Sequence, residues 1–286
     1  MVDIMILLDY SQTVIGSFMA MSKGGGVVEE DMLRHIILNT IRQFRKQFTE
    51  EYGEIVICCD HYKNWRKDVF PEYKANRRPK RDSDPVDWQH LFDCLNIMRD
   101  DLEKYFPYKV LYVEGAEADD IIGVLVHHYK EVPTLILSSD KDFMQLHIEN
   151  GIDQWSPLQK KFLKGNPQDS LYEKVIRGDT GDGVPNILSA DDTFITENKR
   201  QKPITQKKLD AWRSLYTNEK FDDWTNEMYR NYCRNKSMVD LKETPESIRL
   251  NIITNYESQE LGSRSDLLNY FVSKRLKNLM EHIEEF

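Results

Sequence analysis

Four short apolar runs, each followed at or near its end by an acidic residue, constrain most strongly how this chain can fold. They read as buried strands and cover Asp3–Leu8, Glu54–Cys59, Lys109–Val113 and Thr134–Ser139. Between them, Asp31–Gln47 and Asp87–Tyr105 repeat apolar residues at helical spacing. Because strands that alternate with helices form parallel sheets through right-handed crossovers, we predict an α/β fold with a largely parallel central sheet flanked by helices.

The acidic residues that follow the four runs are expected to meet at one edge of this sheet. Parallel sheets bind ligands beyond the carboxyl ends of their strands. The acids found at or near that edge are Asp9, Asp60, Asp119 and Asp140. One aspartate after a strand is most often a turn or cap residue. The same arrangement after every predicted strand favours a shared site.

A dense acidic cluster begins the helix predicted after the third run. It contains Glu117, Asp119 and Asp120. One carboxylate in the first turn of a helix is ordinary capping, but three repel one another unless a cation lies between them. A hard divalent ion with oxygen ligands is the simplest cation for this position. Asp120 is explained equally well as a helix cap or as a residue that supports the ligands.

Further acids extend the candidate metal site. Asp142 follows Asp140 by two residues, and Asp179 and Asp182 lie in a glycine-rich stretch after the predicted helix Gln168–Ile176. An EF-hand calcium loop is excluded there because its twelve-residue spacing and terminal glutamate are missing. The eight candidate ligands are Asp9, Asp60, Glu117, Asp119, Asp140, Asp142, Asp179 and Asp182. Their charge exceeds that of two divalent ions, and two Mg²⁺ ions about 4 Å apart are a known arrangement for phosphodiester cleavage.

The charge distribution favours a nucleic-acid partner although the net charge is −9. His61–Arg81 contains eight basic residues against two acidic ones, and Lys199–Arg213 contains six against one. Either patch alone is compatible with a solvated surface. Two patches together with an acidic cluster suit a phosphate polyanion, which needs Lys and Arg for binding and metal ions for chemistry.

Composition places the chain among globular proteins without a membrane segment. No apolar run approaches the roughly 20 residues of a membrane span, and the N-terminus does not resemble a secretory signal, so we expect a cytoplasmic protein. The cysteines are Cys58, Cys59, Cys94 and Cys233. Their spacing predicts reduced, buried residues rather than zinc ligands.

Six motifs in a fixed order carry a resemblance to a known family. They are LLDYSQ, ICCDH, WRKDVFPEYKANR, EADD, SSDKDFMQL and GDTGDGVPN. Over residues 3–190 the chain resembles the 5′-nuclease or flap endonuclease family, and within it the RNase H enzymes of T-even-type bacteriophages. The resemblance implies a PIN-like nuclease core, with RNase H, 5′-to-3′ exonuclease and flap endonuclease activity on RNA–DNA and DNA duplexes. It also implies removal of RNA primers from lagging-strand fragments during phage DNA replication in the host cell cytoplasm.

The resemblance also assigns roles to individual residues. The first Mg²⁺ site would contain Asp9, Asp60, Glu117 and Asp119, and the second would contain Asp140, Asp142, Asp179 and Asp182, with Mn²⁺ as a substitute. In the bridge over the active site, Arg66 and Lys74 would meet the scissile phosphate and Tyr73 would stack on a terminal base. Further nucleic-acid contacts are expected from Lys63, Arg77, Arg78, Lys202, Lys207 and Lys208. A helix is expected to begin near Pro71, and Lys80–Asp87 is expected to be a mobile loop.

We divide the chain into a nuclease core, residues 1–185 with the bridge at about 61–90, and a helical domain, residues 186–286. Helical spacing predicts Pro203–Tyr216, Glu219–Arg234, Pro245–Tyr256 and Arg264–Ile283. The family's second glycine-rich hairpin is missing here, so we expect a modified helix-hairpin-helix duplex clamp whose second helix starts near Thr205 and which lacks a bound monovalent ion. Relatives suggest that the basic residues Lys274, Arg275 and Lys277 contact single-stranded-DNA-binding protein. The chain is expected to be a monomer.

Two other functions are compatible with parts of the sequence. A PIN-type ribonuclease would share the sheet and several acids but would lack the bridge, the clamp segment, and Asp179 and Asp182. A non-catalytic nucleic-acid-binding paralogue should have lost at least one acid of the first site. None is lost in this sequence.

Overall fold

A single mixed sheet lies at the centre of the computed structural model, which describes residues 4–22, 27–149, 151–218, 220–222 and 224–286. Six strands within these residues pair in the order β3-β2-β1-β4-β5-β6. They are β1 (Met5–Asp9), β2 (Glu54–Cys59), β3 (Lys109–Tyr112), β4 (Thr134–Leu137), β5 (Ile152–Ser156) and β6 (Lys161–Phe162). The first five are parallel, and β6 runs antiparallel to β5. The predicted α/β fold is therefore confirmed, and β5 and β6 are additions to the four predicted strands.

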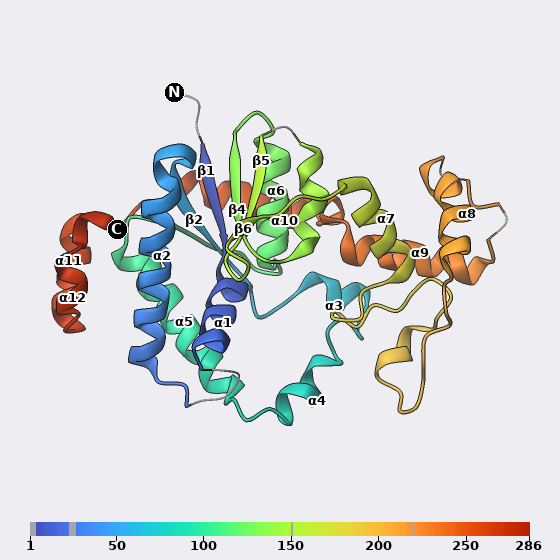
Figure 1. The fold of residues 1–286 in the computed structure, drawn as a ribbon, viewed down its shortest axis with the longest axis horizontal. Coiled ribbons are helices and arrows are strands. Elements are labelled where there is room, and N and C mark those ends of the chain that lie inside the picture. Colours follow the sequence, from blue (N-terminus) through green and yellow to red (C-terminus); the bar gives the residue numbers. More distant parts are fainter. Residues whose placement is uncertain (1–3, 23–26, 150, 219, 223) are drawn as a thin grey trace.

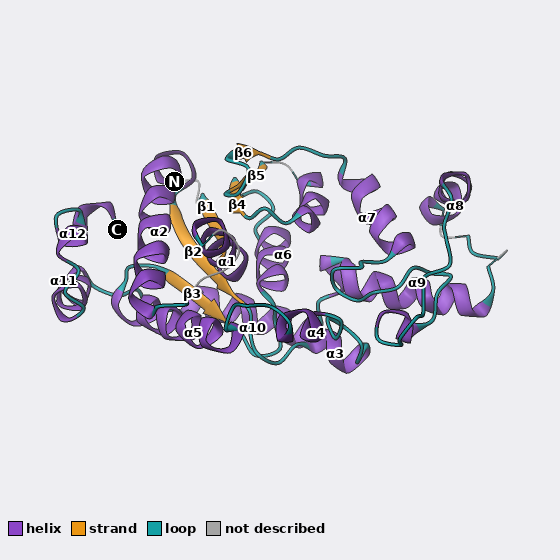
Figure 2. Ribbon diagram, turned by 60° about the horizontal axis from the view of Figure 1, so that its bottom comes forward, coloured by secondary structure: helices purple, strands orange, loops and turns teal. Residues whose placement is uncertain are grey.

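One face of the sheet is covered by α1 (Tyr10–Met21), α2 (Glu30–Tyr52) and α5 (Trp88–Tyr105). The apolar side chains of these helices pack against alternate strand residues such as Ile6, Leu8 and Ile57. The core continues into α11 (Arg264–Ser273) and α12 (Lys277–Met280), which lie on the far side of α2 and α5 from the strands (Figure 2). Phe286, at the end of the sequence, joins the same core beside Phe106 and Phe271.

The opposite face is covered by α6 (Ala118–His128), α10 (Glu246–Ser258) and the 3₁₀ helix η1 (Lys141–Ile148). Leu7, Val56 and Cys58 point into this second core. Figure 2 shows α2 and α6 on opposite sides of the strands. Because both faces are covered, the central strands β1 and β4 are buried along their whole length and almost entirely apolar, rather than alternating with polar residues.

A third core lies beside the sheet and joins the bridge to the helices that follow it. It contains α7 (Pro167–Arg177), α8 (Gln206–Thr217) and α9 (Asn226–Val239), with Trp65, Phe70 and Tyr73 from the bridge. The remaining 3₁₀ helices are η2 (Asp191–Phe194), η3 (Leu241–Glu243) and η4 (Ile283–Glu285). The helices after residue 185 are thus shared among three cores, and α8 and α11 lie at opposite ends of the molecule (Figure 1).

The bridge differs in detail from the prediction. Its helices are α3 (Trp65–Val69) and α4 (Arg77–Asp82), and turns connect them. No helix begins at Pro71, which follows the end of α3, and the expected loop Lys80–Asp87 starts inside α4. Figure 1 shows this segment passing below the sheet, from the side of α9 toward α1 and α5.

The strand order places a binding crevice at the carboxyl edge of the sheet. β1 pairs with β2 on one side and with β4 on the other, so the chain adds β2 and β3 on one side of β1 and then returns to add β4 and β5 on the other side. Open α/β sheets bind ligands where the strand order reverses in this way. The predicted acids follow β1, β2 and β4 at this edge.

Two smaller predictions have mixed outcomes. Cys58 and Cys59 are buried on opposite faces of β2 and Cys94 is buried, but Cys233 is exposed on α9, so its prediction as a buried residue is wrong. In the described ranges, no helix has the length and hydropathy to span a membrane.

Candidate active site

Asp9 is the most deeply placed acid at the carboxyl edge of the sheet. It ends β1 and caps α1 by accepting a hydrogen bond from the Gln12 amide, while Ser138 Oγ donates to its Oδ2 across 2.9 Å. Burial, together with repulsion from Asp60 and Asp140, raises the pKa of Asp9 to about 8. The carboxyl groups that end β1 and follow β2 and β4 therefore lie close enough to repel one another.

Asp119 joins these acids from the first turn of α6. Burial raises the pKa of Asp119 well above its usual range, and repulsion from Glu117, Asp140 and Asp9 adds to this although Lys74 opposes it. Asp60 is more exposed and accepts a hydrogen bond from the Ala118 amide across 2.9 Å. Strand ends and a helix start thus bring one set of carboxylates together.

A second set of acids surrounds the ammonium group of Lys174 on α7. This group contacts Asp142 and lies 2.6 Å from Asp179 Oδ2. Asp140 caps η1 and accepts from the Asp142 amide across 2.9 Å. Burial and repulsion from Asp140 raise the pKa of Asp142 to about 7, although Lys174 lowers it. Asp140 therefore links the two sets electrostatically.

The glycine-rich turn after α7 places Asp179 and Asp182 beside the sheet edge. Gly178 has φ +71°, and a Cβ there would lie 2.3 Å from the Val184 carbonyl oxygen, so only glycine fits. Asp179 and Val184 exchange backbone hydrogen bonds, and Asp179 Oδ1 accepts from the amides of Gly181 and Asp182. This closed turn positions both carboxylates.

The bridge contacts this edge through Tyr73 and Lys74. Tyr73 Oη lies 2.9 Å from both Glu117 Oε2 and Asp182 Oδ2. Lys74 Nζ lies 2.5 Å from Glu117 Oε1 and 3.7 Å from Asp182 Oδ2. Burial alone would raise the pKa of Glu117, but Lys74 and Arg66 lower it below its usual range. The pKa of Asp182 is also lowered, because Lys74 and Arg77 outweigh the effect of burial.

Arg66 and Tyr73 lie deeper than the sequence prediction assumed. Each is 1% exposed. The Arg66 guanidinium contacts Asp120 Oδ2 at 2.9 Å, Glu117 Oε2 at 3.3 Å and the Met238 carbonyl at 2.9 Å. Both side chains are buried and bonded to carboxylates of the chain itself, so this placement does not support the expected phosphate contact of Arg66 or the base stacking of Tyr73. Both residues instead hold the acids in place.

Asp120 is a buried structural residue rather than a member of the open acidic edge. It is 0% exposed and accepts hydrogen bonds from Trp65 Nε1, Arg66, the Glu117 amide and Thr244 Oγ1. These contacts join the bridge, the start of α6 and the segment before α10. The sequence left open whether Asp120 is a metal ligand or a helix cap. These contacts favour a capping and supporting role.

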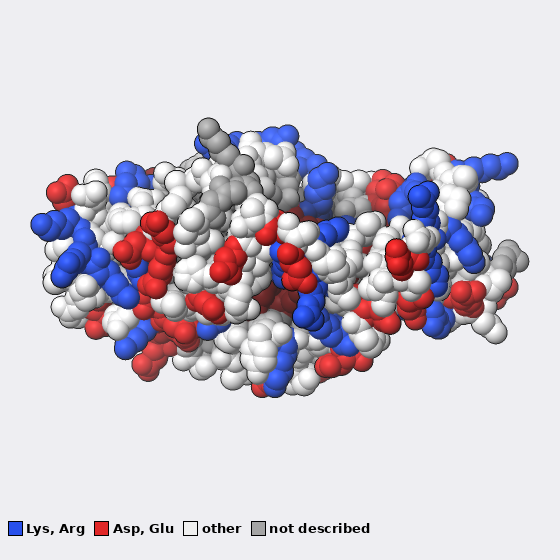
Figure 3. Space-filling model, turned by 90° about the horizontal axis from the view of Figure 1, so that it is seen from below, with Lys and Arg blue, Asp and Glu red and all other residues white. Residues whose placement is uncertain are grey.

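The predicted basic contacts divide into two groups. Near the acids, Arg77 pairs with Asp182, Lys63 pairs with Glu114, and Arg78 is exposed. Lys202, Lys207 and Lys208 are exposed around the start of α8, which follows its N-cap residue Thr205 and so begins near the predicted position. Figure 3, the view onto the carboxyl edge, shows acidic side chains in a central hollow with Lys and Arg beside them, and more Lys and Arg toward the α8 end.

A long loop that contains η2 connects α7 to α8, in the segment where the sequence predicts a modified hairpin. The Asn186 side chain donates to the Lys202 carbonyl and accepts from Ser189 Oγ, and Gln201 Oε1 accepts from the Asn186 amide. Lys202 in turn donates its amide to Ser189 Oγ. Side-chain hydrogen bonds therefore close this loop.

The eight acids fit divalent cations by their chemistry and charge. All offer oxygen ligands, and burial together with repulsion from neighbouring carboxylates raises the pKa values of Asp9, Asp119 and Asp142. In the part of the chain that the structure describes, no three acidic, His or Cys side chains already form a coordination shell. Lys74 and Lys174 instead lie between carboxylates as the neutralising cations.

The fold and the matches to known families together define a class: nucleases that hydrolyse phosphodiester bonds. The chain matches the N-terminal resolvase-like domain of 5′-3′ exonucleases over residues 4–175 and the C-terminal domain of T4 RNase H over residues 165–286. It therefore belongs to the 5′-3′ exonuclease family, as the motifs suggested, and is an enzyme of that nuclease family.

Individual relatives agree with this assignment. The chain is 32% identical to ribonuclease H of Enterobacteria phage T4, over 98% of this chain and 95% of that protein. It is 30% identical to a 5′-3′ exonuclease of Buchnera aphidicola, over 53% of each chain. The solved flap endonuclease of bacteriophage T5, in a pseudo-enzyme-product complex with DNA and metal ions, shares the fold with a TM-score of 0.60 at 16% identity, covering 98% of this chain and 99% of that one.

Lys174 and Ser138 are site residues that sequence reasoning missed. Lys174 precedes Asp179 by five residues on the predicted helix Gln168–Ile176, and Ser138 precedes Asp140 by two. A lysine facing the acidic turn at the end of that helix was a usable signal. Ser138 offered none, because serine is common wherever a strand ends.

Proposed function

We propose that this protein is a Mg²⁺-dependent 5′-nuclease that acts as an RNase H, a 5′-to-3′ exonuclease and a flap endonuclease. Its substrates would be RNA–DNA and DNA duplexes with 5′ ends or flaps, and its role the removal of RNA primers from lagging-strand fragments in phage DNA replication. The observation that carries this proposal is the convergence of eight carboxylates from five separate segments at one sheet edge, beneath a basic bridge.

The carboxylates would hold two Mg²⁺ ions in two sets. The first set is Asp9, Asp60, Glu117 and Asp119, and the second is Asp140, Asp142, Asp179 and Asp182. When bound, the ions supply an activated water for attack on phosphorus and stabilise the leaving oxygen. Mn²⁺ would substitute because it accepts the same oxygen ligands.

Lys74 is the bridge residue best placed to meet the substrate. Its side chain is 20% exposed and lies between Glu117 and Asp182, so its ammonium faces the edge where a scissile phosphate would bind. A positive group at this point stabilises the negative charge that develops on phosphate oxygens. Arg66 and Tyr73 act as positioning residues, because their buried polar groups fix Glu117 and Asp182.

The remaining basic residues would bind the nucleic-acid backbone. Lys63, Arg77 and Arg78 lie on the bridge side, and Lys202, Lys207 and Lys208 lie around the start of α8. Contacts at two separated places suit a duplex that is held by its backbone while its 5′ end reaches the acids. The C-terminal helices are proposed to contact single-stranded-DNA-binding protein, and the enzyme to work as a monomer in the host cytoplasm.

Cleavage assays with defined substrates test this function. We expect 5′-labelled flap, nicked DNA and RNA–DNA duplexes to be cut with Mg²⁺ or Mn²⁺ and to remain intact in EDTA. A PIN-type ribonuclease would instead cut single-stranded RNA and spare all three duplexes. Absence of cleavage with either ion would contradict the proposal.

A further inference from the structure

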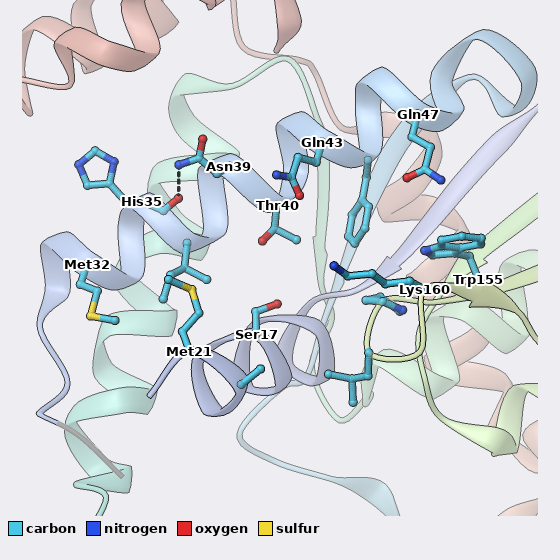
Figure 4. A pocket seen from close by; sticks show the side chains of 15 residues that line it. Ser17, Met21, Met32, His35, Asn39, Thr40, Gln43, Gln47, Trp155 and Lys160 are labelled. Atoms are coloured by element: carbon cyan, nitrogen blue, oxygen red, sulfur yellow. Dashed lines mark hydrogen bonds between the residues drawn. The ribbon is translucent and has the colours of Figure 1, made fainter. Parts of the chain in front are cut away.

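A long groove lies between α1, α2 and the turn that joins β5 to β6. Its volume is about 970 Å³, and none of the proposed site residues lines it. Figure 4 shows Ser17 and Met21 of α1 facing a row of α2 side chains, with Trp155 and Lys160 closing the groove near Gln47. This cavity plays no part in the proposed nuclease reaction.

The groove is elongated along α2. Its lining residues on that helix run from Met32 to Gln47, which corresponds to roughly 22 Å at the rise of an α-helix. The volume is at the upper end of the roughly 300–1,000 Å³ typical of small-molecule pockets. A site of this length bounded by two helices suits a chain segment better than a compact ligand.

The lining combines an apolar surface with a row of polar groups. Ile36 and Phe44 contribute apolar surface from α2, and Met21 and Leu158 at the rim are 60% and 53% exposed. Exposed apolar side chains that line one groove mark an interaction site. His35, Asn39, Gln43 and Gln47 follow one another at intervals of four residues, so they form a polar row along the groove (Figure 4).

The charge of the groove narrows the choice of partner. Lys160 is the permanently charged residue among the described residues that line it, and none of them is acidic. Nucleic acid binds through several Lys and Arg residues, so one lysine beside apolar groups does not suit it. A carboxylate complements Lys160, and an apolar face complements the methionine and aromatic surface.

We propose that this groove binds an amphipathic segment of a partner protein, with its apolar face against α1 and α2 and a carboxylate at Lys160. The geometry corresponds to recognition of an amphipathic helix in a hydrophobic groove. Exposed methionine at the rim adapts readily to the shape of such a partner. This site is separate from the C-terminal surface proposed for single-stranded-DNA-binding protein.

Synthetic peptides test this inference with the full-length protein. The test uses three panels of fluorescein-labelled, 14-residue helical peptides. Peptides of the first panel have an apolar face with Glu beside it, and those of the second panel have the same face with Lys in place of Glu. Peptides of the third panel keep Glu, but their apolar residues are shuffled so that they no longer form one face. We expect peptides of the first panel to bind at least tenfold tighter than their Lys and shuffled counterparts, measured by fluorescence anisotropy. Equal binding by all three panels, or no binding, would overturn the proposal.

Matched variants locate the binding. Ala20→Trp fills the groove and Lys160→Glu reverses its charge, so each should weaken binding of the Glu panel at least tenfold, whereas Ala20→Ser and Lys161→Glu should leave it unchanged. Circular dichroism and thermal unfolding would verify that all four variants are folded. Equal losses in Lys160→Glu and Lys161→Glu, or concentration-dependent self-association that Ala20→Trp abolishes, would overturn the proposal, the latter by assigning the groove to a second copy of this chain.

Discussion

The ammonium group of Lys74 lies 2.5 Å from Glu117 Oε1, although Lys74 belongs to the bridge and Glu117 precedes α6. Lys74 has φ 59°, a left-handed conformation that is rare for a residue with a long side chain. Its amide donates to the Asp182 carbonyl oxygen across 2.7 Å, which holds the backbone in this conformation. The lysine is therefore fixed against both sets of acids, and strain of this kind is common at functional sites.

Lys74→Ala should lower the single-turnover cleavage rate by about 10²-fold or more at saturating DNA. The reason is loss of a charge that stabilises the transition state, and a hundredfold loss corresponds to about 3 kcal/mol. Rapid-quench measurements with a 5′-flap substrate would give this rate. Lys80→Ala, in the exposed part of α4, is the control and should weaken affinity slightly without changing the saturated rate. If both variants lost only affinity, Lys74 would be a general DNA contact.

Asp119→Asn should abolish cleavage while duplex binding stays largely intact. Asp119 interacts with Glu117, Asp140 and Asp9, so loss of its charge should reduce metal affinity where the two sets meet. Asp84→Asn, in an exposed turn of the bridge, is a matched control that should cleave normally. Near-normal turnover of Asp119→Asn at millimolar Mg²⁺ would show that the metal assignment is wrong.

Asp179→Asn and Asp182→Asn should shift the Mg²⁺ dependence of cleavage to higher concentration. Both carboxylates come from the turn after α7 and lie beside Lys174 or Lys74 rather than at the strand ends. Titration of activity from micromolar to tens of millimolar Mg²⁺ would measure the shift. If the titration curves of both variants matched the wild-type curve, these acids would have a purely structural role in the turn.

Arg66→Ala should reduce the free energy of unfolding by about 3–5 kcal/mol, because it leaves the buried Asp120 without its cation and leaves Glu117 with Lys74 alone. Urea denaturation at pH 7 would measure this loss. Arg78→Ala, exposed on α4, should leave stability nearly unchanged. A stable Arg66→Ala protein with a selective loss of cleavage would support the phosphate contact that the sequence suggested.

The strands and the acidic edge could be predicted from the sequence. An apolar run indicates a buried strand, and the acid that follows it marks the carboxyl end of that strand. Strand β5 was missed because IDQWS has little apolar character and pairs only at the outer part of the sheet. The predicted helix Arg264–Ile283 is interrupted where Arg275 has φ 56°, a local reversal that apolar spacing does not reveal.

The burial of Arg66 also could not be predicted from the sequence. An arginine within a basic stretch is normally exposed. Its burial depends on Asp120 and on the Met238 carbonyl, 54 and 172 residues away along the chain. Such partners become visible only when α6, α9 and the bridge are placed together. Motif order therefore located the acids, whereas the supporting contacts required the tertiary structure.

Stability of the metal-free protein should fall as the pH rises from about 5 to 8. The pKa of Asp9 is raised to about 8 and that of Asp142 to about 7, so the folded state binds these protons more tightly than the unfolded state, where the values are about 4. The stabilisation is complete below the unfolded value and is lost as the pH passes the folded value. Glu117 and Asp182 have lowered pKa values, so their ionised forms stabilise the folded state. Their contribution to stability is lost only as the pH falls below the range of about 5 to 8.

Asp9→Asn tests the origin of this pH dependence. It removes a buried carboxylate that repels Asp60 and Asp140, so the variant should melt at a higher temperature than wild type at pH 8 in EDTA, by about 2–4 °C for each kcal/mol of repulsion removed. At pH 5, where Asp9 is protonated, the two proteins should differ much less. Thermal unfolding followed by circular dichroism across this range gives both values. Added Mg²⁺ should stabilise wild type more than Asp9→Asn at pH 8, because divalent ions neutralise the same carboxylates. A variant that reproduced the wild-type pH profile with and without Mg²⁺ would show that Asp9 carries no unbalanced charge.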